Sequence, residues 1–260
     1  MRHLSRAGFE EARSFIAAHA RPLEQALFAF WFEGGEAAAV VRALQPYQNE
    51  DGGFGHGLEP DFLLADSSPL ATTVALQYLG FLGRPPEDGM VRAAMEYLLG
   101  ALDPHQLRWP AVPAAVNAAP HAPWWHVDPE TGRCSVEGTW ANPSAEIVSY
   151  LWRYARWVPT PFRDRLTDKA LAELRGAPFP IDLHDFLCWA RLGAVLPGAP
   201  GEEVVARLGE SVLQTVDPNA SSWASYGAEP LALAPGPDAL FAGELADLIA
   251  ENLDYRIASR

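Results

Sequence analysis

Residue types suited to acid–base chemistry gather in two short stretches of the chain. Residues 48–62 read QNEDGGFGHGLEPDF, and residues 182–185 read DLHD. Carboxyl and imidazole groups transfer protons near neutral pH when burial and neighbouring charges adjust their pKa. We therefore predict acid–base roles for five groups in these stretches: His56, Glu59, Asp61, His184 and Asp185.

The stretch at 182–185 also fits the start of a helix. In that interpretation Asp182 is the N-cap, Asp185 interacts with the positive end of the helix dipole, and His184 points to water. The competing interpretation places His184 beside a carboxylate in an acid–base cluster at the wall of a cavity. The sequence leaves both interpretations open.

A long stretch without helical periodicity, residues 102–142, is rich in aromatic and imidazole groups. Its second half reads HAPWWHVDPETGRCSVEGTWANP, and its prolines prevent a regular helix. Long ordered loops in compact domains commonly cover binding sites. In the alternative interpretation the tryptophans only pack the loop onto the protein. For substrate binding we predict eight side chains from this loop and from later segments: His121, Trp124, Trp125, His126, Trp140, Trp189, Trp223 and Tyr226.

The polar residues at the end of this loop have a local explanation. Asn142, Ser144 and Glu146 precede or begin a predicted helix. Small polar residues followed by glutamate are typical of an N-cap and a capping box. We therefore interpret these three residues first as capping residues.

Hydrophobic periodicity predicts about ten helices and no strand ladder. Helices such as 87–101 and 201–216 have one apolar and one charged face, which is typical of half-exposed helices. Helices such as 22–33, 68–82 and 182–196 are apolar nearly all round, which indicates protein or a lined cavity on every side. The two kinds alternate along the chain over residues 6–19, 22–33, 36–45, 68–82, 87–101, 143–157, 162–175, 182–196, 201–216 and 238–254.

The links between the predicted helices alternate in the same way. Short links contain glycine and proline, as at Gly34-Gly35 and at Pro197-Gly198-Ala199-Pro200. The long links are residues 46–67, 102–142 and 217–237. If neighbouring helices are antiparallel, all the long links lie at one end of the protein, where the apolar helices begin.

Two pairs of sequence matches share a period of about 57 residues, which indicates an internal repeat. Gly57-Leu58-Glu59-Pro60 recurs as Gly227-Ala228-Glu229-Pro230. Asp103-Pro104 with Trp109 recurs as Asp217-Pro218 with Trp223. A pair of helices with its loops has about this length, so the matches predict stacked helical hairpins that bury their faces against neighbours.

The segment QNEDGGFG resembles the glutamine–tryptophan-type motif of squalene cyclases, other class II terpene cyclases and protein prenyltransferase beta subunits. The run SPLATTVALQYL after it resembles the inner helix that follows the motif in those families. The matching residues are Gln48, Asp51, Gly52, Gly53, Phe54 and Gly55.

This resemblance implies an all-α fold of the α/α toroid type, with an inner and an outer ring of helices around an apolar cavity. We expect one domain over residues 1–260, built from about five helical hairpins. The loops 46–67 and 102–142 are expected over the mouth of the cavity.

The motif also has a structural interpretation, as a link between helices. Glycine permits positive φ and a close approach of backbones. Asp51 can accept hydrogen bonds from free amides at a helix start, and Phe54 can stack between helical layers. Under this interpretation the residues that face the cavity mouth are His56, Glu59, Asp61 and Asp66.

The chemistry of the resembled families has only partial counterparts here. Those cyclases use an acid within Asp-x-Asp-Asp, whereas the nearest string, at 182–185, has His184 at the middle acid position. An imidazolium is too weak an acid to protonate an isolated alkene. The prenyltransferases use zinc held by Asp, Cys and His, whereas Cys188 and His184 lack an evident third ligand. Asp-Asp-x-x-Asp is also missing, so we expect neither a metal nor another cofactor, and no diphosphate substrate.

Composition limits the partners. The chain has 260 residues and a formal charge of -14, which disfavours nucleic acid and anionic membranes. The longest apolar run, near residues 27–32, is too short to cross a bilayer, and residues 1–15 lack the apolar core of a signal peptide. Cys134 and Cys188 do not have the spacing of a disulfide framework or a zinc site. We expect a soluble cytoplasmic protein that binds a hydrophobic small molecule, and the sequence does not indicate its oligomeric state.

Three functions remain in competition. The leading hypothesis is a metal-independent acid–base enzyme, similar to the terpene cyclase and prenyltransferase group, that acts on an isoprenoid-like substrate. The second is a protein that binds a hydrophobic ligand without catalysis. The third is a carbohydrate-active enzyme on an (α/α) barrel, because acids and tryptophans together also suit sugars.

Overall fold

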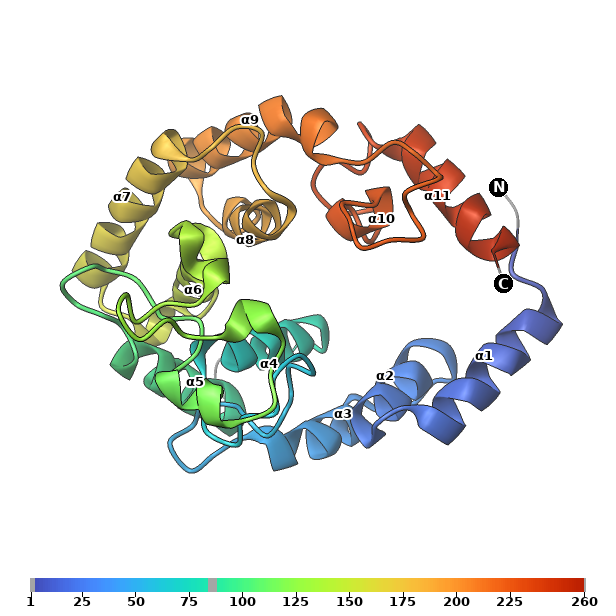
Figure 1. Cartoon of the computed structure of the whole chain (residues 1–260), viewed down its shortest axis with the longest axis horizontal. Helices are drawn as coiled ribbons and strands as arrows, with labels where there is room; N and C mark the ends of the chain where they lie inside the picture. The colour runs from blue at the N-terminus through green and yellow to red at the C-terminus, as the bar shows by residue number, and fades with distance from the viewer. Residues whose placement is uncertain (1–2, 84–87, 260) are drawn as a thin grey trace. The chain divides into compact units, whose positions relative to one another are not determined.

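The protein is helical in the part that the structure describes, residues 3–83 and 88–259 (Figure 1). This computed structural model contains α-helices and short 3-10 helices joined by loops. Over the described ranges, extended segments pair only as isolated bridges, such as Gln48 with Phe54. The prediction of a helical fold without a strand ladder is therefore confirmed.

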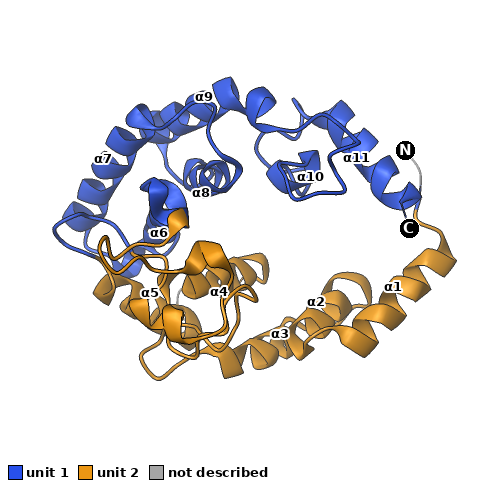
Figure 2. Ribbon diagram, viewed as in Figure 1, with its two compact units in different colours: residues 1–3, 103–109, 136–260 blue, residues 4–102, 110–135 orange. Residues whose placement is uncertain are grey.

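The chain divides into two compact units (Figure 2). Unit 1 consists mainly of Asp103–Trp109 and Val136–Arg260. Unit 2 consists mainly of Leu4–Leu102 and Pro110–Ser135. The long loop predicted at 102–142 therefore contributes residues to both units.

Within the described residues, unit 2 contains five α-helices and the largest part of the long loop. Its α-helices and 3-10 helices are α1 (Arg6–His19), α2 (Pro22–Phe32), α3 (Ala37–Leu44), η1 (Gln45–Tyr47), α4 (Pro69–Phe81), α5 (Gly89–Gly100), η2 (Ala114–Ala118) and η3 (Pro123–Trp125). Side-chain oxygens cap the starts of three of these helices: Ser5 caps α1, Ser68 caps α4 and Asp88 caps α5.

Unit 1 contains the remaining α-helices. They are α6 (Ala141–Arg153), α7 (Thr160–Gly176), α8 (Leu183–Gly193), α9 (Gly198–Thr215), α10 (Pro230–Leu233) and α11 (Ala246–Ala258), with η5 (Ala155–Trp157) after α6. The short helix η4 (Ser135–Gly138) lies where the chain passes from unit 2 into unit 1.

The helices of unit 1 pack in two rows (Figure 1). α8 contacts α6 and α10, while α7 contacts α9. α6 is buried almost all round from Pro143 to Leu151, whereas α9 buries one face through Val204, Leu208 and Val212. The predicted alternation of fully apolar and half-exposed helices therefore holds for α6 and α9, because α6 has neighbours on more sides. It fails for the last predicted helix, because Asn252 is the one fully buried residue that α11 has within the described ranges.

Unit 2 follows the alternation only in part. α4 is buried on most sides and α5 on one side, as predicted. α2 was predicted to meet protein or a lined cavity on every side, and protein covers only part of its surface. Only Leu23 of this helix is fully buried, while Trp31 and Phe32 are 57% and 64% exposed. Its helix contacts come mainly from α1 and α3, which cover part of its surface.

The predicted helix boundaries are close to the observed ones except at the C-terminal end. The helix predicted at 238–254 is in fact α11, at Ala246–Ala258, and residues 238–245 form turns. Phe241 has a positive φ of 64°, which interrupts a right-handed helix, and its ring lies against Phe186 of α8. Residues 84–87 lie outside the described residues. A predicted short link and the first residue of the predicted helix 87–101 fall on them.

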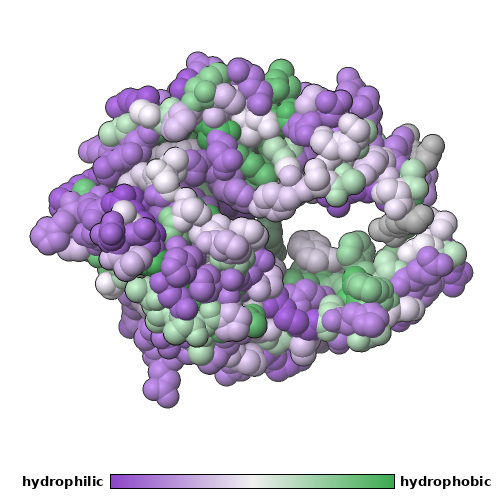
Figure 3. Space-filling view, viewed as in Figure 1, coloured by the Kyte–Doolittle hydropathy of each residue, from purple (hydrophilic) through white to green (hydrophobic). Residues whose placement is uncertain are grey.

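The visible surface is mostly hydrophilic, with small hydrophobic areas between the polar ones (Figure 3). This agrees with the formal charge of -14. Among the described helices, none combines the length and the apolar character that crossing a membrane requires.

Candidate functional site

The motif at 48–55 is a network that ties its loop to helices α4 and α5. Gln48 Nε2 donates hydrogen bonds to the carbonyls of Gly52, at 2.9 Å, and of Met90, at 3.1 Å. Asp51 Oδ1 accepts from the backbone N–H of Gly53, at 3.0 Å, and from Ser67 Oγ, at 2.7 Å. Asp51 therefore stabilises the loop itself, whereas Ser68 caps α4.

Two glycines of the motif have no room for a side chain. A Cβ on Gly52, which has a φ of +87°, would lie 2.3 Å from the carbonyl oxygen of Ala93 in α5. A Cβ on Gly55 would lie 2.3 Å from the carbonyl oxygen of Ala65. These contacts explain why this sequence needs glycine there, and they support the structural interpretation of the motif.

His56 belongs to this structural network. Its Nε2 lies 2.9 Å from Asn49 Oδ1, and the amide oxygen accepts, so Nε2 carries the hydrogen. Asn49 Nδ2 in turn donates to the carbonyl of Ala65 and to Ser67 Oγ. His56 is exposed at the surface, and its ring is bound to the loop through Asn49.

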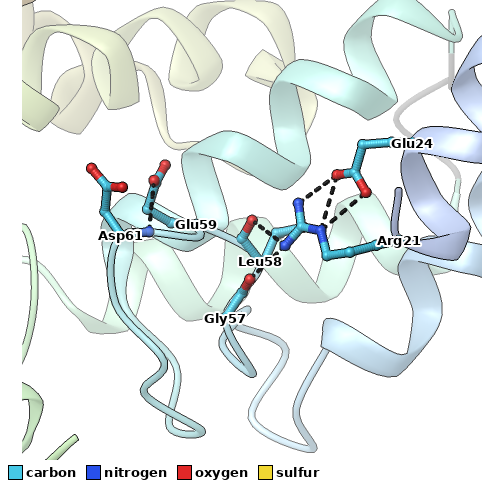
Figure 4. A network of polar contacts seen from close by, with 6 residues as sticks. All are labelled: Arg21, Glu24, Gly57, Leu58, Glu59 and Asp61. Atoms are coloured by element: carbon cyan, nitrogen blue, oxygen red, sulfur yellow. Dashed lines mark hydrogen bonds and ion pairs between the residues drawn. The ribbon is translucent and has the colours of Figure 1, made fainter. Parts of the chain in front are cut away.

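Arg21 fixes the second half of the same loop (Figure 4). Its guanidinium binds the carboxylate of Glu24 and donates to the carbonyls of Gly57, at 2.7 Å, and Leu58, at 3.3 Å. The guanidinium also lies over the ring of Tyr47, 5.7 Å from its centroid. The start of α2 thereby holds the loop just before its acidic residues.

Glu59 and Asp61 follow directly in the chain. The backbone N–H of Asp61 donates to Glu59 Oε1 at 3.3 Å, so the two residues lie next to each other (Figure 4). Burial raises the pKa of Glu59, and the hydrogen bond from Asp61 N–H opposes this shift. Asp61 itself is exposed. Of the three acid–base candidates in unit 2, Glu59 therefore has the environment of a general acid.

The start of α8 brings together the predicted cap and one predicted acid. Asp182 Oδ1 accepts from the backbone N–H of His184 at 2.9 Å, which confirms Asp182 as the N-cap. The ring of His184 does not simply point to water, because its Nε2 lies 2.7 Å from the hydroxyl of Tyr226. Both side chains of this pair are exposed.

Asp185, in contrast to His184, is buried. Burial raises the pKa of its carboxyl, a hydrogen bond with Thr139 lowers it, and the nearby Asp182 carboxylate raises it further. A carboxyl group that keeps its proton to higher pH suits general acid catalysis.

Stacked indoles lie beside this acid in the chain. Trp140 follows Thr139 and stacks on Trp189, which lies one helical turn after Asp185, with ring centroids 5.9 Å apart. The Thr139–Asp185 hydrogen bond and the Trp140–Trp189 stack thus both join the end of the loop to α8. We name the four residues Thr139, Trp140, Asp185 and Trp189 the Asp185 cluster.

The backbone around the cluster is fixed by its own hydrogen bonds. Trp140 Nε1 donates to the carbonyl of Leu107 at 2.8 Å. Arg108 Nη2 donates to the carbonyls of Glu137, at 3.2 Å, and Thr139, at 3.1 Å. Trp189 Nε1, by contrast, is buried without a hydrogen-bond partner among the described residues.

Comparisons with protein-family models, with curated proteins and with solved structures find no match to this chain.

Glu146 is a buried acid that the sequence interpretation missed. It was interpreted as part of a capping box, but it lies inside α6, where Oε1 accepts from the hydroxyl of Tyr150 at 2.6 Å and Oε2 lies 3.1 Å from Arg191 Nη1. The thiol of Cys188 is 4.0 Å from the same Oε2. Ser144 does not cap α6 either, because its hydroxyl accepts from the backbone N–H of Trp109.

Burial dominates the electrostatics of this second group. It raises the pKa of the Tyr150 hydroxyl and of the Cys188 thiol well above their usual values, and the charge of Glu146 raises both further. The thiol is therefore poorly suited to act as a nucleophile. A sequence signal did exist: Glu146 and Arg191 are charged residues in mostly apolar stretches of their helices, and a charged side chain in the core is normally paired.

The predicted aromatic residues form several separate pairs. In unit 2, Trp125 packs edge to face on Phe62, while Trp124 is 46% exposed. The rings of His121 and His126, in the same loop, have their centroids 5.5 Å apart. In unit 1, Trp223 packs on Tyr255 and donates from Nε1 to the carbonyl of Asp217 at 2.9 Å.

Metal ligands are not grouped in the described ranges: no set of three or more His, Cys, Asp or Glu side chains there has the geometry to hold an ion. Asp185 combines a buried carboxyl with neighbouring stacked indoles, and we take the Asp185 cluster as the candidate site.

Proposed function

We propose that the protein is an α/α toroid of about five helical hairpins that acts on a hydrophobic, isoprenoid-like small molecule by acid–base chemistry. The resemblance of QNEDGGFG to the motif of terpene cyclases and prenyltransferases supports the fold. The two rows of helices within unit 1 also support it.

The observation that carries the proposed chemistry is the environment of Asp185. Its carboxyl is buried, has a raised pKa and is held by Thr139. Next to these residues in the chain, the faces of Trp140 and Trp189 are stacked. Indole faces attract positive charge, so an acid beside them suits a reaction in which protonation leaves a cationic carbon framework.

The roles follow from these positions. Asp185 delivers the proton, Thr139 orients its carboxyl, and the two indoles contact the apolar substrate. Glu146 and Arg191 lie farther along the same pair of helices, where they fix α6 to α8 and so position the acid. Glu59 is the corresponding candidate acid of unit 2, and burial raises its pKa as well.

The test is turnover of defined substrates by the purified protein. Linear isoprenoid alcohols and their epoxides are incubated with the wild type and the products are separated by gas chromatography with mass spectrometry. Asp185→Asn should lower the rate by about 100-fold or more, since a general acid contributes at least that much. Asp182→Asn is the matched control, because it changes a neighbouring carboxyl that caps the same helix.

The other outcomes decide between the competing functions. Equal turnover by the wild type and by Asp185→Asn removes this residue from the mechanism. Binding of the same isoprenoids without any product favours the non-catalytic ligand-binding protein. Hydrolysis of aryl glycosides, lost in Glu59→Gln, favours the carbohydrate-active enzyme.

A further inference from the structure

Two histidines of the long loop meet edge to edge. His121 Nε2 lies 3.3 Å from His126 Nδ1, the ring centroids are 5.5 Å apart, and the ring planes are inclined by 20°. The distance between the two ring centroids is longer than the N–N distance by roughly twice the distance from the centre of an imidazole ring to one of its nitrogens. Both nitrogens therefore lie close to the line that joins the ring centres. The rings are therefore nearly coplanar, and the hydrogen bond runs within their planes.

The neighbouring carbonyl fixes which nitrogen carries each proton. His121 Nδ1 lies 2.7 Å from the carbonyl oxygen of Ala119, which can only accept, so Nδ1 is the protonated nitrogen. In the neutral ring, His121 Nε2 then has a lone pair and accepts the hydrogen of His126 Nδ1. The remaining nitrogen of His126, Nε2, consequently has its lone pair available, and His126 is exposed to solvent.

The loop holds both rings in place from either side. Asn117 pairs with Val127 through two hydrogen bonds, of 2.7 and 2.8 Å, directly after His126. Trp125, directly before it, is buried against Phe62. The residues that flank His121 are bound as well. The backbone carbonyl of Pro120 accepts from the N–H of Leu63, and the N–H of Ala122 donates to the backbone carbonyl of Asp61. The pair is thus built on a backbone that is fixed on both sides.

We propose that His121 and His126 form a catalytic dyad that hydrolyses small aryl esters. His126 Nε2 is the nucleophile, and His121 is the positioning residue that takes up the proton from His126 Nδ1. The exposed ring of Trp124, two residues before His126, offers a flat apolar surface that suits an aryl group. Hydrogen-bonded histidine pairs of this kind are suited to nucleophilic catalysis because a base removes the proton as the bond forms.

The reaction balances with water as the only co-reactant. His126 Nε2 attacks the acyl carbon, the bond from carbon to the phenol oxygen breaks, and the phenolate leaves. At the same time the proton of His126 Nδ1 moves to His121 Nε2, so the acyl-imidazole is neutral and His121 carries the charge. Water then cleaves the acyl-imidazole to the carboxylic acid, His126 regains a proton at Nδ1, and the remaining proton goes to the phenolate.

The experiment uses the full chain and p-nitrophenyl acetate. His126→Gln should lower the protein-dependent release of p-nitrophenolate by about tenfold or more. His121→Phe, which neither orients nor accepts the proton, should lower it severalfold. In His121→Gln the amide oxygen still accepts a hydrogen bond from His126 Nδ1, so the rate of this variant should lie between the rates of His121→Phe and the wild type. His105→Gln removes another exposed histidine and should leave the rate unchanged.

A second measurement needs no turnover. The ¹⁵N chemical shifts of His126 should show the Nδ1–H tautomer in the wild type and in His121→Gln, and mainly the Nε2–H tautomer in His121→Phe. Loss of fold in any variant is recognised by circular dichroism and separated from loss of the dyad. The proposal is overturned if His126→Gln hydrolyses the ester at the wild-type rate or if His126 of the wild type carries its proton on Nε2. Neither readout involves an isoprenoid, so this proposal and the proposed function fail separately.

Discussion

Glu146 of α6 and Arg191 of α8 form an ion pair across two packed helices, with Glu146 Oε2 3.1 Å from Arg191 Nη1. The Glu146 side chain is 5% exposed and that of Arg191 is 35% exposed, so the acid is the more deeply buried partner. The hydroxyl of Tyr150 occupies the other carboxylate oxygen. The pair therefore sets the position of α8, and with it that of Asp185, relative to α6.

Replacing the arginine should destabilise the fold. Arg191→Met keeps a long apolar stem but leaves the charge of Glu146 buried without its cation. Removing one partner of a buried pair costs about 3 kcal/mol or more, and we expect a loss at the lower end because Arg191 is partly exposed. Urea unfolding of both proteins, monitored by circular dichroism, measures the difference in the free energy of unfolding.

The double variant is the control for this prediction. Glu146→Gln together with Arg191→Met removes both charges, and well-packed neutral replacements of a buried pair are often close to neutral. The double variant should therefore recover most of the stability that the single variant loses. An Arg191→Met protein with an unchanged urea midpoint would show that the pair contributes nothing.

The raised pKa of Asp185 predicts a definite pH dependence of stability. Its pKa in the folded state lies above the ordinary value of 3.8, because burial disfavours the carboxylate. A group with a raised folded pKa contributes stability that is fully present below its unfolded pKa and is lost as the pH rises through the folded pKa. The stability of the wild type relative to Asp185→Asn should therefore fall as the pH rises from 3.8 and then level off, which urea titrations between pH 3 and about 8 can follow.

Asp128 provides a comparison of opposite sign. Hydrogen bonds from the backbone N–H groups of Thr131 and Glu130 lower its pKa below 3.8. The stability that Asp128 contributes is present above its pKa in the unfolded state, and it is lost as the pH falls through its pKa in the folded state. The stability of the wild type relative to Asp128→Asn should thus fall only below pH 3.8. Identical pH profiles for the two variants would contradict both assignments.

Local signals in the sequence predicted most of the helices and the cap of α8. Periodicity and helix-start residues act within a few turns of chain, so Asp182 could be assigned as an N-cap before any tertiary contact was known. The repeat was also informative. Asp103 and Asp217, which were matched through the internal repeat, each accept a hydrogen bond from the backbone N–H two residues later. The pKa of both carboxyls is lowered, at Asp103 by backbone hydrogen bonds and at Asp217 first by the hydroxyl of Ser222 and then by the backbone N–H of Asn219.

Features that depend on distant contacts could not be predicted in this way. Glu146 and Arg191 are 45 residues apart, and only the packing of α6 on α8 makes the glutamate an ion-pair partner rather than a capping residue. The exposure of Trp31 and Phe32 in α2 depends on which helices cover that surface, and composition contains no such information. A turn at Phe241 stands in place of the predicted helix, and the ring of Phe241 packs against Phe186, a contact outside the local sequence.

The close approach of Gly52 to α5 predicts a large effect of a single methyl group. Gly52→Ala places a Cβ 2.3 Å from the carbonyl oxygen of Ala93 and forces alanine to a φ of +87°. We expect a loss of more than about 1 kcal/mol in the free energy of unfolding, measured by urea titration. Gly100→Ala at the end of α5 is the matched control, because a Cβ there meets nothing within 4 Å. It should stabilise the helix by about 0.5 kcal/mol, and a similar loss in both variants would mean that the steric explanation is wrong.

The stacked pair Trp140 and Trp189 allows the value of one hydrogen bond to be measured within the candidate site. Both indoles are buried, but Nε1 of Trp140 donates to the carbonyl of Leu107 whereas Nε1 of Trp189 has no partner among the described residues. Replacing either tryptophan by phenylalanine removes a similar ring volume, so the packing losses largely cancel in the comparison. Trp140→Phe should therefore cost about 1 kcal/mol more than Trp189→Phe, because it alone breaks a hydrogen bond and leaves a carbonyl unpaired. If urea titration shows Trp189→Phe to be the more destabilised variant, its indole N–H has a partner, such as a bound ligand or water, and the site holds a polar group beside Asp185.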